Sequence, residues 1–319
     1  LHVIGELERR GISGGVYIGV GPDQNFSYIA RVRPAVAVIV DIRRDNLLLH
    51  LLFRALFELA PTRVEYLCLL TGRAPPERLR EEAAQWRAAG IEKLAAYVEI
   101  APRLPEPADG ASGVGASLPA KLRETINGFG VPLAEADYAT IARFHQAFIG
   151  KGLGLQFQTH GRPIQSYNPT LRDLLTEHDR TGRQRSFLAS EDDYQFVRSL
   201  ERAGKVIPVV GDVAGKRAMP AIAAWMRRAS LQLSTLYISN VEDYLFRGDT
   251  FDSYVANVKA LPRAPGAVVI RSVFRGGRLG RSRDTLPGYA SASLVQPLDA
   301  MLAAHDAGKY TSYYDLIGD

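Results

Sequence analysis

Two glycines and one acidic residue stand at a spacing that suits an adenosine-containing ligand. Gly19 and Gly21 end a short β-branched run, residues 15–21, and a predicted helix begins directly after them. Glycines let the backbone turn sharply and approach a ligand closely, and the free amides of the helix start can face the same ligand. Asp41 lies 20 residues beyond Gly21, where a carboxylate can accept hydrogen bonds from both hydroxyls of a ribose. The spacing predicts an adenosine cofactor.

The residues of the turn favour one adenosine cofactor over the others. In a dinucleotide fingerprint, G-x-G-x-x-G, the third glycine lets helix and strand pack closely around a pyrophosphate. Gln24 occupies that position here, and Asp23 puts a negative charge where the diphosphate would lie. S-adenosylmethionine has no phosphate and carries a sulfonium and an ammonium, which tolerate nearby carboxylates. The turn therefore favours S-adenosylmethionine, and an NAD(P)-dependent oxidoreductase is the weaker alternative.

Alternating apolar segments predict the elements that position these residues. Strands are predicted at residues 15–21, 35–41, 205–212, 233–239 and 267–271, with helices between them. This rhythm predicts an α/β fold with a doubly wound, mostly parallel, Rossmann-like sheet. A helix at 294–304 and an edge strand at 310–317 are expected to complete the chain. Because ligands bind outside the carboxyl ends of parallel strands, the residues that follow each strand are the site candidates.

Between the second and third strands the strand pattern stops. Residues 61–190 contain helical segments near 64–70, 77–98, 119–127, 134–149 and 169–178. This segment is far longer than the dozen or so residues that a plain crossover needs, so we expect a large helical insertion that caps the site. The predicted organisation is a Rossmann-like domain in two halves, 1–60 and 191–319, around a helical lid at 61–190. A proline- and glycine-rich flexible linker is expected near 102–119.

Four segments resemble the class I S-adenosylmethionine-dependent methyltransferases, which have a Rossmann-like fold. Residues 16–22 resemble the glycine-rich first motif, and residues 38–42 resemble the second-strand motif that ends in an acid. Residues 209–213 are similar to the third-strand segment, and residues 237–245 to the fourth-strand motif that faces the methyl group. The whole chain also resembles a bacterial branch of this superfamily that shares the Gly-Val-Gly-Pro-Asp-Gln-Asn-Phe start and the Ser-Asn-Val-Glu segment. That resemblance implies a fold and no particular reaction.

The resemblance also implies which residues bind the cofactor. Asp41 would bind the ribose, Asp212 the adenine amino group, and the turn after the first strand the amino-acid end. Superfamily members usually have an acid where this chain has Tyr17 and a small residue where it has Asp23, so Asp23 is a candidate replacement for the missing acid. The expected cofactor-binding residues are Tyr17, Gly19, Gly21, Pro22, Asp23, Gln24, Asn25, Asp41, Ile42, Asp212, Val213 and Asn240.

The candidate catalytic residues come from two regions. Asn240 and Glu242 follow the fourth strand and are expected to orient or deprotonate the methyl acceptor, with His145 of the insertion, or His160, as a further candidate base. Each has a structural alternative: helix capping for Asn240 and Glu242, and a partly buried or surface position for the histidines. Asp212 can likewise be a capping or turn residue. Arg271, at the end of the fifth strand, can clamp an anionic substrate or belong to a solvated basic loop.

These features predict an enzyme that transfers a methyl group to a small molecule by in-line displacement at the sulfonium. Two alternatives use the same binding residues. One is a non-methylating S-adenosylmethionine enzyme of the cyclisation or lyase type, and the other is a non-catalytic protein that binds S-adenosylmethionine or S-adenosylhomocysteine.

Charge and composition exclude several classes of partner and site. The formal charge of +5 is spread without a Lys/Arg block, which makes a nucleic-acid partner unlikely. No apolar stretch approaches the roughly 18 residues of a membrane span. The single cysteine, Cys68, lies in an apolar run, which is typical of a buried thiol in a reducing cytoplasm. The six histidines show no i, i+4 pair, so no metal site is expected. Nothing indicates the oligomeric state.

Overall fold

The structure is a computed structural model that describes residues 1–104, 117–156, 168–274 and 291–318. The chain divides into two compact units. The first comprises residues 1–46, 178–183 and 205–319, and the second comprises residues 47–177 and 184–204. The second unit therefore extends beyond the predicted insertion at both ends. Most of the predicted linker, residues 105–116, lies outside the described residues.

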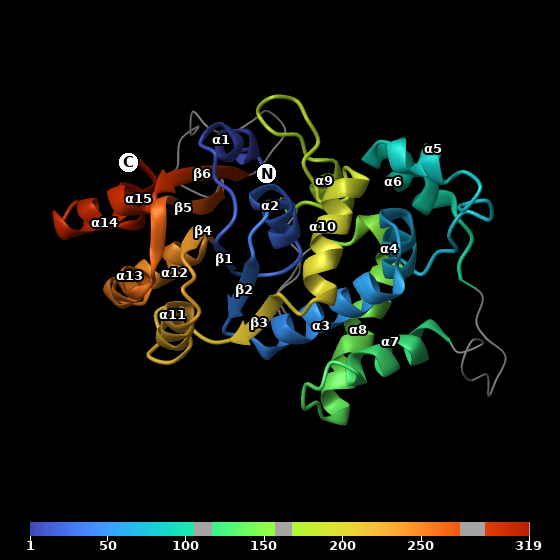
Figure 1. Cartoon of the computed structure of the whole chain (residues 1–319), viewed down its shortest axis with the longest axis horizontal. Coiled ribbons are helices and arrows are strands. Elements are labelled where there is room, and N and C mark those ends of the chain that lie inside the picture. The colour runs from blue at the N-terminus through green and yellow to red at the C-terminus, as the bar shows by residue number, and fades with distance from the viewer. Residues whose placement is uncertain (105–116, 157–167, 275–290, 319) are drawn as a thin grey trace. The chain divides into compact units, whose positions relative to one another are not determined.

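The described part of the first unit contains one six-stranded sheet (Figure 1). The strands are β1 (Val16–Gly19), β2 (Val36–Asp41), β3 (Val206–Val210), β4 (Leu233–Ser239), β5 (Arg263–Phe274) and β6 (Ser291–Pro297). Their order is β3-β2-β1-β4-β5-β6. All neighbouring pairs are parallel except β5 and β6, which are antiparallel. The prediction of an α/β fold with a mostly parallel sheet is confirmed, and the order is the one found in doubly wound sheets.

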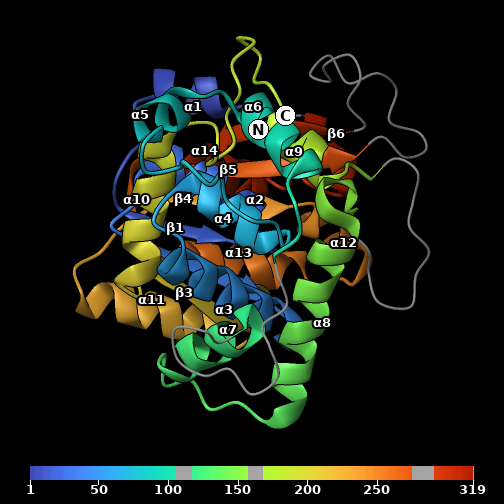
Figure 2. The same ribbon diagram turned by 90° about the vertical axis from the view of Figure 1, so that its right-hand side faces the viewer.

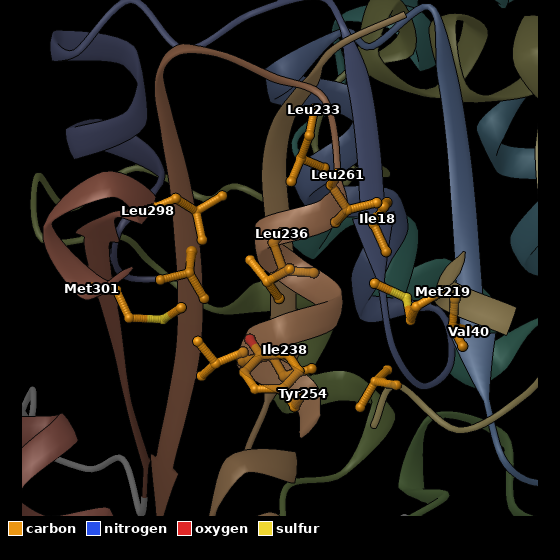
Figure 3. Close-up of a cluster of buried hydrophobic side chains, with 14 of the residues drawn as sticks. Ile18, Val40, Met219, Leu233, Leu236, Ile238, Tyr254, Leu261, Leu298 and Met301 are labelled. Carbon is orange, nitrogen blue, oxygen red and sulfur yellow. The ribbon is translucent and has the colours of Figure 1, made fainter. Parts of the chain in front are cut away.

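Helices cover both faces of this sheet. On one face, α11 (Ala218–Arg228), α13 (Phe251–Ala260) and α14 (Leu298–Asp306) pack against β-branched and leucine side chains of the strands. Figure 3 shows Met219, Tyr254 and Met301 from these helices against Ile18 and Leu236 of the central strands. On the other face lies α2 (Gln24–Val32), whose Tyr28 ring stands 4.9 Å from the ring of Tyr237 in β4. Since β1 and β4 are covered on both sides, they are the buried centre of the unit.

The end of the chain differs from its prediction. Residues 291–297 form strand β6, so the expected helix at 294–304 begins only at Leu298. The expected edge strand at 310–317 is wrong, because the chain forms α15 (Tyr313–Gly318) there. The Asp315 carboxylate accepts the amide of Ser312 at 2.8 Å, and the Ser312 hydroxyl accepts the amide of Asp315 at 3.4 Å. This capping box starts the helix in spite of the strand preference of its tyrosines.

The first unit also includes two short helices, α1 (Ile4–Arg9) and α12 (Val241–Arg247). Helix α3 (Arg44–Leu59) begins in the first unit and continues into the second. The second unit is helical in its described parts (Figure 2). Its other α-helices are α4 (Arg63–Leu70), α5 (Ala83–Ala88), α6 (Ile91–Ile100), α7 (Leu118–Asn127), α8 (Glu135–Lys151), α9 (Leu171–Thr176) and α10 (Glu191–Arg202). Within the described ranges, no helix is long and apolar enough to cross a membrane.

Candidate functional site

The sheet places the predicted binding residues at one edge. In the order β3-β2-β1-β4-β5-β6 the direction of winding reverses between β1 and β4, and open α/β sheets bind ligands at the carboxyl end of such a switch point. The carboxyl ends of β1 to β4 are followed by residues 20–24, 42–43, 211–213 and 240–242. Segments that are far apart in the sequence are thus brought to the same edge.

The buried side chain of Asn25 fixes the turn after β1 by hydrogen bonds. Its Nδ2 donates to the carbonyl oxygens of Val20 at 3.0 Å, Gly21 at 3.1 Å and Pro22 at 2.6 Å. Its Oδ1 accepts a hydrogen bond from the Tyr17 hydroxyl at 2.9 Å, and both side chains are fully buried. Tyr17 and Asn25, which were predicted to bind the cofactor, therefore shape the turn, and their buried side chains are not accessible to a ligand.

The two glycines of the turn are required for different reasons. Gly21 has φ +81°, a left-handed conformation that glycine adopts without steric cost, and the space beside it is open. Gly19 lies directly under Asn25. A Cβ at Gly19 would clash with the Oδ1 of Asn25 and would stand 2.7 Å from Cε1 of Tyr17. Only Gly21 thus leaves room for a ligand, whereas Gly19 makes room for the side chain that holds the turn.

Replacing Gly19 with alanine is expected to lower the free energy of unfolding by about 1–3 kcal/mol, because the new methyl group displaces Asn25 from its hydrogen bonds. Urea unfolding followed by circular dichroism measures this. Gly154→Ala is the matched control, since no atom lies within 4 Å of the added Cβ. A Gly19→Ala variant as stable as that control would show that Asn25 does not need this space.

Asp23 lies in the same turn, and among the described residues its carboxylate has no ion-pair partner and no hydrogen bond to another residue. It occupies the N-cap position of α2, but its side chain makes no capping hydrogen bond. Burial raises the pKa of the carboxyl to about 6, although a hydrogen bond to its own backbone amide acts in the opposite direction. Taking a carboxylate out of water is costly unless it is paired or hydrogen-bonded. Asp23 therefore offers a negative charge that the described part of the chain does not neutralise.

Gln24 occupies the position of the third glycine of the dinucleotide fingerprint, and its side chain forms a hydrogen bond in the structure. Its Oε1 accepts a hydrogen bond from the Tyr237 hydroxyl at 2.9 Å, which ties the start of α2 to β4. A side chain therefore fills the place where a dinucleotide-binding turn packs its helix closely against the strand.

The acid at the end of β2 is already hydrogen-bonded. Asp41 Oδ1 accepts the backbone amide of Arg43 at 2.9 Å and its Nε at 3.0 Å, and Oδ2 accepts its Nη2 at 2.9 Å. The Arg43 side chain is 46% exposed, whereas that of Asp41 is 10% exposed. The Asp41 carboxylate is thus held in a fixed orientation at the edge of the sheet, and the guanidinium that binds it is accessible to solvent.

Three large apolar side chains are exposed in segments at or after the carboxyl ends of β2, β3 and β4. Ile42 is 70% exposed, Val210 at the end of β3 is 43% exposed, and Tyr244 in α12 is 55% exposed. The register pairs Asp41 directly with Val210 across β2 and β3. Ligand sites are lined mainly by apolar side chains with a few polar groups among them.

The loop after β3 is mainly structural. Asp212 is exposed, and its Oδ1 accepts the amide of Ala214 at 2.9 Å, as its turn alternative requires. Val213 is buried in the core, and its carbonyl oxygen accepts Nδ2 of Asn257 at 2.9 Å. The Val213 side chain therefore does not reach a ligand, whereas Asp212 faces solvent, as Lys216 and Arg217 do before α11 begins.

The turn after β4 contains a feature that its sequence does not signal. Ser239 has φ +53°, a conformation that costs a non-glycine residue about 1–2 kcal/mol. Asn240 follows at the N-cap position of α12, but its side chain makes no capping hydrogen bond. The capping alternative for Asn240 is therefore wrong, and a half-buried amide stands at the switch point. Strained backbone held in place by its surroundings is frequent at functional sites.

Glu242 and Arg271 bind each other. Glu242 Oε2 lies 2.5 Å from Arg271 Nε, and the Tyr254 hydroxyl donates to Oε1 at 3.3 Å. Arg271 Nη1 also donates to Oε1 of Gln296 at 2.8 Å, and the side chains of the ion pair are at most 2% exposed. Glu242 is thus neither a cap nor an accessible base, and Arg271 is neither a substrate clamp nor part of a solvated loop. The buried pair joins α12 to β5.

His145 is buried in α8 of the second unit. Its Nε2 lies 2.9 Å from the carbonyl oxygen of Leu69, and burial lowers the pKa of the imidazole although that hydrogen bond opposes the shift. These contacts support its structural alternative. His160 lies outside the described residues. Within the described ranges, no group of three His, Cys, Asp or Glu side chains can hold a metal ion.

A family model described as a domain of unknown function, DUF7790, matches residues 6–90 and 147–312, which is more than half of the chain. The matched residues include the turn after β1, Asp41 and the turn after β4, whereas His145 lies between the two matched parts. No curated protein matches the chain.

Proposed function

The chain belongs to the DUF7790 family, and we propose that its sheet-bearing unit is a Rossmann-like, methyltransferase-like domain that binds S-adenosylmethionine and transfers the methyl group to a small molecule. The cofactor would lie at the carboxyl edge of the sheet, across the switch point between β1 and β4.

The observation that carries this proposal is the unneutralised carboxylate of Asp23 beside the open Gly21 turn. A negative charge at this place repels a pyrophosphate and attracts a cation. S-adenosylmethionine carries an ammonium and a sulfonium on the part of the molecule that the glycine turn would hold. Asp23 therefore takes the role of the acid that this chain lacks at Tyr17.

The adenosine part of the cofactor fits the residues of β2 and β3. Asp41, at the end of β2, would bind the ribose. Ile42 and Val210 offer apolar surface for the adenine ring, and the exposed Asp212 is placed to accept its amino group.

The sixth strand argues against a dinucleotide. A dinucleotide-binding sheet consists of two parallel βαβαβ halves, one for each nucleotide. Here β6 is antiparallel to β5, so the second half is not a complete mononucleotide-binding unit. Together with Gln24 and Asp23, this favours a cofactor with a single nucleoside.

Catalysis would depend mainly on holding the methyl acceptor in line with the methyl group of the cofactor. S-adenosylmethionine, when bound, supplies an activated methyl group with a good leaving group. Asn240 is placed at the switch point to hydrogen-bond the acceptor and hold it for in-line attack. Because Glu242 is buried in an ion pair, Asn240 is the preferred candidate of the two.

Calorimetric titration of the whole chain with S-adenosylmethionine, S-adenosylhomocysteine, adenosine and NAD⁺ tests the proposal. We expect the first two to bind, and Asp41→Asn to weaken both at least tenfold, because hydrogen bonds to a charged partner contribute about 1.5–3 kcal/mol each. Asp252→Asn, which changes a 91% exposed carboxylate on α13, is the matched control. Binding of NAD⁺ alone would contradict the proposal. Binding of S-adenosylmethionine without methyl transfer to any acceptor would indicate a non-methylating enzyme or a binding protein.

The affinity for S-adenosylmethionine is expected to fall about tenfold between pH 7 and pH 5. The reason is that Asp23, with a pKa of about 6, is mostly ionised at pH 7 and mostly protonated at pH 5, while the ammonium of the ligand stays charged. Titrations at both pH values measure the change. Adenosine, which has no cation, is expected to show no such dependence, and Asp23→Asn is expected to abolish it. If the affinity of Asp23→Asn for S-adenosylmethionine still falls between pH 7 and pH 5 as in wild type, Asp23 does not bind the ammonium.

A further inference from the structure

The contact between Arg43 and Asp41 is a bidentate ion pair. Nε and Nη2 of the guanidinium lie 3.0 and 2.9 Å from the two oxygens of the carboxylate. The backbone amide of Arg43 donates separately to Oδ1 at 2.9 Å. The side-chain contact can therefore break while the backbone hydrogen bond continues to orient Asp41.

A ribose diol would need the same oxygens. An ionised carboxylate offers about four lone-pair positions, two on each oxygen. The amide and Nε of Arg43 already use Oδ1 twice, and Nη2 uses Oδ2 once. One position is left, but two neighbouring hydroxyls donate two hydrogen bonds. The diol and the guanidinium therefore compete.

Arg43 has other partners within electrostatic range when it leaves Asp41. Its pKa is raised mainly by the hydrogen bond to Asp41, partly offset by burial, and in addition by Asp45 and by the Tyr244 hydroxyl. The side chain is also nearly half exposed to solvent. The guanidinium can thus move without becoming a buried, unpaired charge.

We propose that Arg43 determines the affinity of the ribose site, because its guanidinium occupies the place of the ribose diol on Asp41 and must be displaced when an adenosine ligand binds. This inference rests on the proposed function, since it needs a ligand at Asp41. Arg43 thus competes with the ligand for Asp41. The inference predicts that a chain without the Arg43 guanidinium binds adenosine ligands more tightly than the native chain.

The size of the effect follows from the exposure of the pair. Ion pairs at the surface contribute about 0.2–1 kcal/mol, and an aligned bidentate pair lies at the upper end of that range. Removal of the guanidinium is therefore expected to increase the affinity for adenosine ligands by up to about fivefold. Since salt screens exposed charges, the gain is expected to shrink as the ionic strength rises.

The test compares wild type with Arg43→Met, which keeps the stem and the backbone amide but lacks the guanidinium. S-adenosylhomocysteine is titrated calorimetrically at 50 mM and 500 mM salt. We expect Arg43→Met to bind about two- to fivefold more tightly at low salt, with a smaller difference at high salt. Arg247→Met is the matched control, because Arg247 forms an exposed ion pair with Asp243 at 2.6 Å and does not contact Asp41. That variant is expected to bind like wild type.

The outcomes separate this inference from the proposed function. If Asp41→Asn loses binding while Arg43→Met binds like wild type or more weakly, the cofactor assignment stands and the competition is refuted. If neither wild type nor Arg43→Met binds S-adenosylhomocysteine, S-adenosylmethionine or adenosine, both are refuted. Tighter binding by Arg43→Met that does not depend on salt would also contradict the inference, since it would point to a change other than the loss of an exposed charge.

Discussion

Replacing Arg271 with methionine is expected to lower the free energy of unfolding by about 3–5 kcal/mol, because it leaves the Glu242 carboxylate buried without its cation. The variant also removes the donor to Gln296, whose Nε2 in turn donates to the Tyr310 hydroxyl at 3.1 Å. The loss therefore affects the contacts of β5 with α12, β6 and the end of the chain. Urea unfolding followed by circular dichroism measures the change.

Two further variants show whether the unpaired charge is the cause. The double variant Arg271→Met/Glu242→Met is expected to recover much of the loss, because replacing both ions by apolar side chains of similar size is often close to neutral. Arg247→Met, which breaks an ion pair whose arginine side chain is 71% exposed, is expected to cost less than about 1 kcal/mol. A loss in Arg271→Met no greater than in Arg247→Met would show that the buried pair is not a major source of stability.

A loss of similar size, about 3–5 kcal/mol, is expected when Arg63 is replaced with methionine. Arg63 is fully buried at the start of α4, and its guanidinium donates to the carbonyl oxygens of Leu188 at 2.7 Å and of Trp86, Arg87 and Ala89 around the end of α5. Removing it leaves these carbonyl oxygens without their donor, and it leaves the Glu191 carboxylate, 3.5 Å from Nε, without its cation.

Urea unfolding and hydrogen exchange test this prediction together. Helix α5 is expected to exchange its amides faster in Arg63→Met, since its last carbonyl groups lose their cap. Arg63→Lys is expected to recover only part of the loss, because an ammonium cannot reach acceptors on several sides at once. Arg172→Met, which removes exposed ion pairs to Glu92 and Glu99, is the matched control. Full recovery in the lysine variant would show that the charge alone, without the fork geometry, is sufficient.

The strands of the sheet were predictable because their patterns are local. Residues 36–40 are apolar on both faces, and such a run, bounded by Pro34 and Asp41, fits a buried parallel strand. Strand β6 was missed because its alternating residues run directly into helix α14, and α15 was missed because its tyrosines favour a strand while its capping box favours a helix. In both places two local signals conflict, and at α15 the capping box prevails over the strand preference of the tyrosines.

The sequence by itself determined that Gly21, Asp23 and Asp41 follow parallel strands, since each lies next to the apolar run that positions it. Only the tertiary structure decided that Glu242 pairs with Arg271, 29 residues away, and that Arg63 reaches Leu188, 125 residues away. The physical reason is that the role of a charged side chain depends on its burial and on its nearest partners, and both are set by segments that are distant in the chain.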